Sequence, residues 1–511
     1  MPKIVIREYD KTSAGVGLYS NFTVLVPGFV GNSYDATKFD ENGVYEVSSK
    51  NDFDNYIGKK AADEGIIRDA WAPTINGEIF QYPDGSEESG YEWIIGKFAE
   101  LAEGEGLFEV TENESGEIGY HRDEEHEFTQ LIESEIESDY DAVGKSYAKI
   151  TLGENEGGNT EYGEQYGNQI AYELIKLGYT VLFKKVDHLS DLSSDAFWSP
   201  LKDKSVYDFR FVINGLITGN DTANIKIRDL ADFVNTNPKG SGRGDCVALC
   251  DVDSTTYIAD GQAISQATAI ENIKIKVQSF TASKYAALFA PFVTYNMLVD
   301  EAYAGNTTFP AHFHYLACAA KAAENYNEWY AIAGYSRGIS PYNIAAIGCK
   351  FGEAAVDALE PRYQATNDNL DKAVNLIIKV KNNFYLWGNR TAEELGKEGS
   401  DNADLRASHF LNIRQLCTTI KKQVYITCRK YTFDPNSDTL WINFCNDIRP
   451  LLEKMKADQG ITDYKFVKIK TSQKGILKAK IRIVPIEAVE DFDISLTLED
   501  SITGTESVID E

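Results

Sequence analysis

The sequence predicts a multidomain protein of mixed α+β and α/β class. We expect an α/β middle region, an acidic surface insertion, and a C-terminal domain of a mixed sheet plus helices that is completed by strand exchange. Three observations support this prediction. The chain has 511 residues, too many for one ordinary hydrophobic core. Apolar runs of strand length alternate with helical segments between about 170 and 380. The block 59–168 has a different, glycine-rich and acidic texture.

The composition is that of a folded, strongly acidic protein. Hydrophobic residues make up 43% of the chain and aromatic residues 12%, which is too rich for a disordered polymer. The 79 acidic residues exceed the 50 basic ones and give a net charge of −29. Such a surface repels phosphate, so the composition excludes general nucleic-acid binding. Met1–Ile6 does not resemble a secretory signal, and no window of about 18 apolar residues predicts membrane insertion.

Residues 1–20 are predicted to form an extended arm and a linker. The polar, small residues 11–17 suit a flexible tether. The apolar run Phe22–Gly31 then predicts a strand that ends in a turn. After Tyr45–Val47, three apolar residues recur at helical spacing before Gly58, namely Phe53, Tyr56 and Ile57.

Residues 59–168 are predicted to be an insertion domain on the surface. Acidic residues crowd the segment Glu100–Asp141, in which Arg122 is the only Lys or Arg. A run of this kind is typical of a solvated face. Scattered apolar residues would supply a small core: Trp93, Phe98, Leu107, Phe108, Phe128, Leu131 and Ile132.

The α/β middle region is expected to comprise 21–58 plus 169–380. The amphipathic pattern of Ile170–Leu177 predicts a helix stopped by Gly178, and Tyr179–Phe183 predicts the following strand. Further strands are expected at Phe209–Ile213, Cys246–Cys250, Tyr285–Pro291 and Phe292–Met297, and a helical piece at Leu230–Asn235.

The C-terminal domain is placed at 381–490. Its central feature is Leu405–Thr432, a predicted basic helix without any acidic residue. Tyr464–Lys470 and Ile476–Val484 have the pattern of a hairpin. The side of the helix that faces a core is marked by Phe410, Ile413, Cys417, Ile420 and Val424.

Both ends of the chain have the pattern of a strand that a neighbouring subunit accepts. One lies around Ile4, Val5 and Ile6, where Ile4 and Ile6 alternate against Lys3, Val5 and Arg7. The other lies in the terminal segment 491–511, where the alternating apolar residues are Phe492, Ile494, Leu496 and Leu498. Unpaired strands of this kind suit donation into the open sheet edge of another subunit. The alternative is that both ends complete the sheet of their own subunit.

One motif favours an enzyme. Gly334-Tyr335-Ser336-Arg337-Gly338 matches GxSxG, the nucleophile turn of α/β-hydrolases, so a serine hydrolase using Ser336 is an alternative function. Such an enzyme needs a histidine later in the chain, and only His409 follows. We expect a structural role for this loop and no catalysis.

Metal and cofactor sites are not expected. Asp251-Val252-Asp253 after an apolar run resembles a metal-binding pair, but no GxxxxGK[ST] loop accompanies it. His312 and His314 have i,i+2 spacing, which predicts a packed pair on a strand. The seven cysteines form no CxxC pair, which favours reduced, buried thiols over zinc ligation.

A series of landmarks in one order resembles the sheath proteins of contractile phage tails and related injection machines. Asp434 stands where that family usually has Glu, and the acidic insertion is larger than in short sheaths. The landmarks are Val26–Gly31, Ala171–Val186, Asp245–Asp251, Tyr285–Val293, Trp329–Gly338, Leu386–Thr391, Leu411–Leu416, Thr432–Asn436 and Leu440-Trp441.

This resemblance implies a structural, non-enzymatic virion protein of the contractile tail, assembled in the cytoplasm of the bacterial host. The implied partners are further copies of the chain in a helical stack of rings, the tail tube protein, and the baseplate and tail terminator proteins. Contraction from a metastable extended state would drive the tube through the host envelope. The resemblance also implies a tube-facing basic helix, with the candidates Arg406, Arg414, Lys421 and Lys422. A third reading is a non-contractile virion surface or adhesion protein.

Overall fold

The computed structural model describes the chain in separate stretches. Side chains are described for most residues of 22–28, 35–57, 167–186, 189–216, 221–233, 242–259, 262–297, 305–381, 383–400, 404–470, 476–486 and 488. Within the insertion, only the backbone of five short strands is described: β3 (Thr74–Ile75), β4 (Glu78–Ile79), β5 (Phe108–Glu112), β6 (Ile118–Arg122) and β7 (Leu131–Ile132). The expected terminal strands around Ile4 and Phe492 lie outside the described residues, as do the insertion's predicted core side chains.

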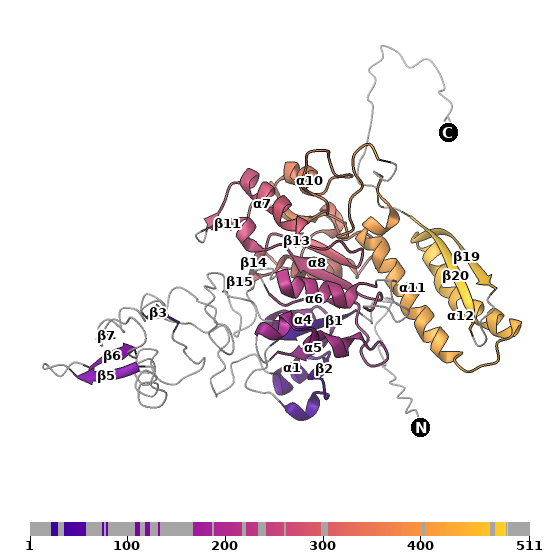
Figure 1. Cartoon of the computed structure of the whole chain (residues 1–511), viewed down its shortest axis with the longest axis horizontal. Coiled ribbons are helices and arrows are strands. Elements are labelled where there is room, and N and C mark those ends of the chain that lie inside the picture. The colour runs from indigo at the N-terminus through magenta and orange to yellow at the C-terminus, as the bar shows by residue number, and fades with distance from the viewer. Residues whose placement is uncertain are drawn as a thin grey trace, which may run out of the picture.

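An eight-stranded sheet forms the centre of the molecule (Figure 1). Its order is β18-β17-β13-β10-β9-β1-β8-β2, and all neighbours pair in parallel except the two edge strands. The parallel strands are β1 (Thr23–Gly28), β8 (Thr180–Lys185), β9 (Phe211–Val212), β10 (Val247–Asp251), β13 (Ala286–Ala290) and β17 (Asn375–Val380). The edges are β2 (Val44–Val47) and β18 (Asn383–Trp387). This mixed α/β sheet agrees with the predicted class of the middle region.

Helices cover both faces of the sheet, which is why its central strands are apolar on both sides. In β10, Ala248 and Cys250 join one hydrophobic core, whereas Val247 and Leu249 join the other. The first core includes side chains of α6 (Asp221–Ala231), α7 (Gln266–Gln278) and α10 (Glu353–Leu359). The second includes α1 (Lys50–Tyr56), α4 (Gly167–Lys176) and α8 (Ala311–Ala322).

Short elements connect these layers. β14 (Val293–Met297) lies between β15 (Gly305–Phe309) and β16 (Ile344–Ile347) in a three-stranded sheet, and β11 (Ile258–Ala259) pairs with β12 (Gln262–Ala263). The short helices are α5 (Asp195–Trp198), α9 (Gly334–Arg337), and the 3₁₀ turns η2 (Ala36–Lys38), η3 (Leu189–Ser193), η4 (Ser199–Lys202), η5 (Ser254–Thr256) and η7 (Ala407–His409).

The C-terminal part is a helix pair with a hairpin, to one side of the central sheet (Figure 1). It consists of α11 (Leu411–Lys430), α12 (Asp438–Ala457), β19 (Ile461–Ile469) and β20 (Lys478–Pro485). The predicted basic helix and hairpin are therefore confirmed. The β17–β18 pair joins residues on both sides of position 381, where the sequence places a domain boundary.

Two element predictions are wrong. Helix α6 ends at Ala231, so only the first two residues of the predicted helical piece Leu230–Asn235 belong to it. His312 and His314 lie in α8, not on a strand. The helix starts there because Pro310 precedes its first turn, and both carboxylate oxygens of Asp251 accept its first backbone amides, from Ala311 at 2.7 Å and His312 at 2.9 Å.

The burial predicted for the cysteines is found for most of them. All seven cysteines are free thiols, and five of them are buried. Cys417 is half-buried and Cys428 is exposed near the end of α11. Among the residues that the structure describes, no helix has both the length and the apolar character to span a membrane.

Asp251→Ala should lower the free energy of unfolding by about 2 to 4 kcal/mol, because two buried amides of α8 lose their acceptor. Asp253→Ala is the matched control, since the Asp253 side chain caps the short turn η5 and pairs with the half-buried Lys276 at 3.2 Å. We expect that control to cost about 1 kcal/mol or less. Urea unfolding followed by circular dichroism measures both, and equal losses would contradict the capping role of Asp251.

Candidate assembly interface

The C-terminal helix pair and hairpin share one hydrophobic core of their own. Ser437 begins α12 as its N-cap, accepting a hydrogen bond from the Leu440 amide at 3.2 Å. The turn before it is fixed by the Tyr431 hydroxyl, which donates to Asp447 at 2.8 Å. The buried members of the core are Trp329, Leu416, Ile420, Phe444, Cys445, Ile448, Leu452, Met455 and Ile461.

One face of the β19–β20 hairpin packs on these helices. Tyr464 pairs with Ile483 and Phe466 with Ile481 across the hairpin, and all four side chains lie against the core. The intervening residues point outward. The hairpin is thus a half-buried sheet, with the alternation expected of one covered face.

Both edges of this hairpin are open in the described part of the chain. β19 and β20 form a sheet of two strands that pair only with each other. A two-stranded sheet is marginal by itself, and its unpaired amides and carbonyls form a template for a further strand. The helices support the hairpin on one face, and no described strand pairs with either outer edge.

The outward face of the hairpin is cationic. Lys465 on β19 and Lys478, Lys480 and Arg482 on β20 are all exposed. Sequence reasoning missed this surface because it concentrated on α11. The signal was present, since residues 464–484 contain seven Lys or Arg and no Asp or Glu.

Two of the four candidate tube-facing residues point into the molecule. Arg414 is buried, with its guanidinium carbon 4.7 Å from the ring centre of Tyr285. The Lys421 ammonium donates to the Gly244 carbonyl and to the Tyr285 hydroxyl, both at 2.8 Å. These two side chains join α11 to the α/β region, because this side of the helix is the one that packs against the sheet.

The other two candidates lie nearer to solvent. Arg406 is exposed and precedes η7, where its backbone amide donates to His409 Nδ1 at 2.9 Å. Lys422 pairs with the exposed Asp208. A contact of Arg406 or Lys422 with a tail tube stays a prediction.

A buried ion pair fixes α11 to the sheet. Arg210, just before β9, lies 2.9 Å from Glu328 and is almost fully buried with it. The same guanidinium donates to the Gln415 side chain at 2.8 Å and to the Gln415 carbonyl at 2.9 Å. A buried charge needs such complete partnering, so this network specifies how the C-terminal part attaches.

Burial also changes the proton affinity of Lys421. Loss of hydration lowers the pKa of its ammonium group to about 8, and the neighbouring positive charge of Arg414 acts in the same direction. The Lys421 ammonium at this junction therefore loses its proton at a lower pH than the ammonium of an exposed lysine.

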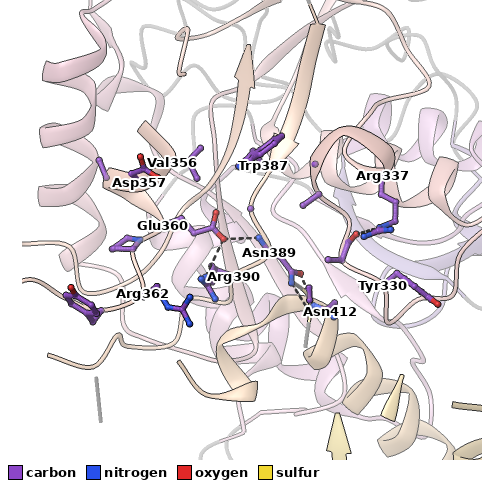
Figure 2. A pocket seen from close by; sticks show the side chains of 18 of the residues that line it. Tyr330, Arg337, Val356, Asp357, Glu360, Arg362, Trp387, Asn389, Arg390 and Asn412 are labelled. Atoms are coloured by element: carbon purple, nitrogen blue, oxygen red, sulfur yellow. Dashed lines mark hydrogen bonds and ion pairs between the residues drawn. The ribbon is translucent and has the colours of Figure 1, made fainter. Parts of the chain in front are cut away.

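A cavity of about 1120 Å³ lies where the C-terminal part meets the α/β region (Figure 2). Glu360 faces its middle, accepting from the Asn389 amide at 3.1 Å and pairing with Arg390 at 3.4 Å. Trp387 at the end of β18 forms part of the wall. Ala488, beyond the hairpin, also lines it, so the chain passes this cavity as it enters its last segment.

The geometry of the GxSxG loop has a steric explanation. Gly334 has a φ of +75°, and a Cβ on Gly338 would lie 2.3 Å from the Leu386 carbonyl oxygen. Both glycines are thus required by the backbone path of α9 beside β18. The loop needs them whether or not Ser336 has any chemical role.

The histidines that the structure describes have other partners than the exposed Ser336. His314 Nδ1 lies 2.6 Å from the Tyr295 hydroxyl, and burial lowers the pKa of this histidine to about 3. His409 bonds to the Arg406 amide and lies 3.1 Å from the Glu394 carbonyl. Within the described ranges, no group of three or more His, Cys, Asp or Glu is arranged to hold a metal ion.

No family model matches the chain, and no curated protein matches it. Solved structures do match. A chain of the anti-feeding prophage baseplate is 12% identical, with a TM-score of 0.46, over 71% of this chain and 86% of that one. A chain of the contracted PVC sheath complex, from an extracellular contractile injection system, is 14% identical, with a TM-score of 0.44, over 64% and 80%. The sheath tail protein of Desulfitobacterium hafniense is 9% identical, with a TM-score of 0.38, over 95% and 100%. At these identities and TM-scores, the matches say nothing of what this chain does.

The junction lysine should make stability depend on pH. Unfolded Lys421 has its ordinary pKa of 10.5, so between about pH 8 and 10.5 the unfolded chain binds a proton that the folded chain does not. The free energy of unfolding should therefore rise with pH across this window, by up to about 3 kcal/mol relative to Lys421→Met. Urea titrations at several pH values measure this difference. Lys422→Met controls for loss of a lysine from the same helix, and a pH-independent difference for Lys421→Met would contradict the buried charge.

Substitutions of Gly338 and of Ser336 in the GxSxG loop should differ in their effect on the free energy of unfolding. Gly338→Ala should destabilise the fold by about 2 kcal/mol or more, because the new methyl group meets backbone. Ser336→Ala should change the free energy of unfolding by less than about 0.5 kcal/mol. Neither the wild type nor the alanine variant should react with a fluorophosphonate probe. Labelling of the wild type that is lost in Ser336→Ala would instead support a serine hydrolase.

Proposed function

We propose that this chain is the structural subunit of a contractile tail sheath, which polymerises around a tail tube and drives the tube through a bacterial envelope when it contracts. The observation that supports this most directly is the hairpin β19–β20. It is a two-stranded sheet with open edges among the described residues, fixed on a rigid helical base. An element of this design is suited to receiving strands from other subunits.

The chain ends have the pattern of the strands to be donated. Ile4 and Ile6 alternate with polar and smaller residues at one end, and Phe492–Leu498 alternates at the other. Added beside β19 or β20, their apolar residues would extend the face that covers the helices. Backbone hydrogen bonds would then hold neighbours together, while the linker 11–17 lets the subunits rotate.

Such a contact builds a filament because it is heterologous. Each subunit offers strands and accepts strands at different places, so the operation repeats without closing on a pair. With a rotation at each step, the product is a helical tube. The resemblance of the ordered sequence landmarks to sheath proteins implies the same arrangement of stacked rings.

The rigid attachment of α11 suits force transmission. The Arg210–Glu328 pair and the contacts of Arg414 and Lys421 join the C-terminal part to the sheet of the same subunit. Movement of the α/β region would therefore carry the hairpin with it. Energy stored in the assembly geometry can drive this motion, so the proposal needs no nucleotide site.

The remaining partners and the location belong to the same proposal. We infer contacts with a tail tube, a baseplate and a tail terminator, in a virion or a related injection device assembled in the bacterial cytoplasm. The acidic block 59–168 is assigned to the outer surface, because its charge suits solvent and not a packed interface.

Negative-stain electron microscopy of the purified chain at rising concentration tests this function. We expect hollow, striated tubes above a threshold concentration, and their loss on deletion of Met1–Asp10. Ser336→Ala is the control and should assemble normally. Monomers that persist at high concentration would contradict the proposal, and binding of such monomers to host surface glycans would favour an adhesion protein.

A further inference from the structure

The turn between α11 and α12 holds an aromatic side chain in water. Phe433 is fully exposed, and no other large apolar residue that the structure describes is as exposed. Its backbone has a φ of +78°, which is strained for an aromatic residue. A ring in water contributes no hydrophobic stabilisation to its own subunit. Exposed and strained positions of this kind cluster at sites that bind a ligand or a partner.

Hydrogen bonds within the turn hold this ring in place. The Asp434 amide donates to the Tyr431 carbonyl at 3.2 Å, and the Ser437 amide donates to the Pro435 carbonyl at 2.8 Å. The ring of Pro435 also fixes its own φ. An anchor that is ordered beforehand loses little conformational freedom when it binds. Phe433 and the exposed Asp434 thus form one apolar and acidic tip, here called the knob.

The cavity between the C-terminal part and the α/β region suits the apolar part of the knob. Trp387, Tyr330 and Val356 contribute apolar surface to its lining (Figure 2). Its volume of about 1120 Å³ is at the upper end of what small ligands occupy. The cavity therefore has room for a turn of protein chain with an aromatic side chain.

The charges of the cavity suit the acidic part of the knob. Two carboxylates of the lining already have a cation beside them, Glu360 with Arg390 and Asp368 with Lys274. The other charged residues of the lining are two cations and one carboxylate: Arg337, Arg362 and Asp357. The excess of positive charge among these three favours a ligand that carries a carboxylate next to an apolar group.

The knob cannot reach the cavity of its own subunit. Asn412, at the start of α11, lines the cavity, whereas the knob follows Lys430, the last residue of that helix. A helix rises about 1.5 Å per residue, so about 27 Å separates the cavity from the knob along α11. A knob can therefore enter only the cavity of another copy. Because knob and cavity are different surfaces, this contact is heterologous and can repeat from copy to copy.

We propose that Phe433 and Asp434 of one copy insert into the cavity beside Trp387 of a second copy. In this contact the Phe433 ring packs against the aromatic wall, and the Asp434 carboxylate faces the guanidinium groups of Arg337 and Arg362. The inference rests on the proposed function and adds to it a contact between copies that involves neither end of the chain. Burial of the ring in the second copy supplies the stabilisation that it lacks in the single subunit.

A photoreactive benzoyl-phenylalanine in place of Phe433 tests this contact in the full-length chain, at a concentration where tubes form. Irradiation should give covalent dimers, and peptide mass spectrometry should locate the second end of the link in the segments that line the cavity. A mixture of isotope-labelled and unlabelled chains shows whether the link joins two copies. The same photoreactive residue in place of Ile442, which is exposed on α12, is the matched control and should give no link to the cavity.

Substitutions measure how much the contact contributes to assembly. Phe433→Ala should raise the threshold concentration for tubes at least about tenfold, because an aromatic anchor is lost. Ile442→Ala should change this threshold by less than about twofold. Asp434→Lys should also raise it, and Arg362→Glu in the same chain should restore part of the loss. Urea unfolding of Phe433→Ala below the threshold should match the wild type, because the ring is exposed in the single subunit.

The results separate this inference from the proposed function. If Phe433→Ala forms tubes at the wild-type threshold, or links from position 433 fall outside the cavity, the sheath proposal stands and this contact is overturned. Links from position 433 to an added tail tube protein, in place of a second copy, would also overturn it. Dimers linked through the cavity without any tubes would keep this contact and contradict the sheath. If neither links nor tubes form, both proposals fail.

Discussion

The C-terminal part of the molecule depends on one buried guanidinium. Arg210 sits at the start of a central strand and binds Glu328 and two groups of Gln415, so three distant segments meet at one charge. Removing Arg210 or Glu328 would leave the other charge buried and unpaired, which strongly lowers the free energy of unfolding. The position of α11, and through it of the whole hairpin, is therefore set by a requirement for charge compensation.

Local patterns in the sequence were sufficient for the regular elements. The strand at Thr23–Gly28, the helix–glycine–strand unit around Gly178 and the hairpin were predictable because apolar spacing and turn residues agree there. The helix at His312 was not, because its start depends on Asp251, which lies 60 residues earlier and reaches it only in the folded sheet. A cap supplied by a side chain far away in the sequence cannot be recognised from the residues next to the helix.

The charge of α11 illustrates the same limit for the candidate interface. A run of basic residues on a helix predicts a cationic surface, but a periodic pattern does not say which face meets the body of the protein. Arg414 and Lys421 turn toward Tyr285. The Arg414 guanidinium lies over the Tyr285 ring, and the Lys421 ammonium donates a hydrogen bond to the Tyr285 hydroxyl. The hairpin row was readable from spacing alone, since Lys478, Lys480 and Arg482 alternate on a predicted strand. The terminal strands remain predictions, because they lie outside the described residues.

The open edges of the hairpin also bear on how the free subunit behaves in solution. Unprotected strand edges are where proteins aggregate without order, and charged side chains along such an edge are a common safeguard. Here Lys478, Lys480 and Arg482 project beside the outer edge of β20, which pairs with no further strand among the described residues, on a molecule whose net charge is −29. Two hairpins meeting edge to edge through β20 would bring six cations together, whereas the overall charge keeps the subunits apart at longer range. The same three cations are thus expected to act as gatekeepers that oppose disordered pairing of subunits at this edge.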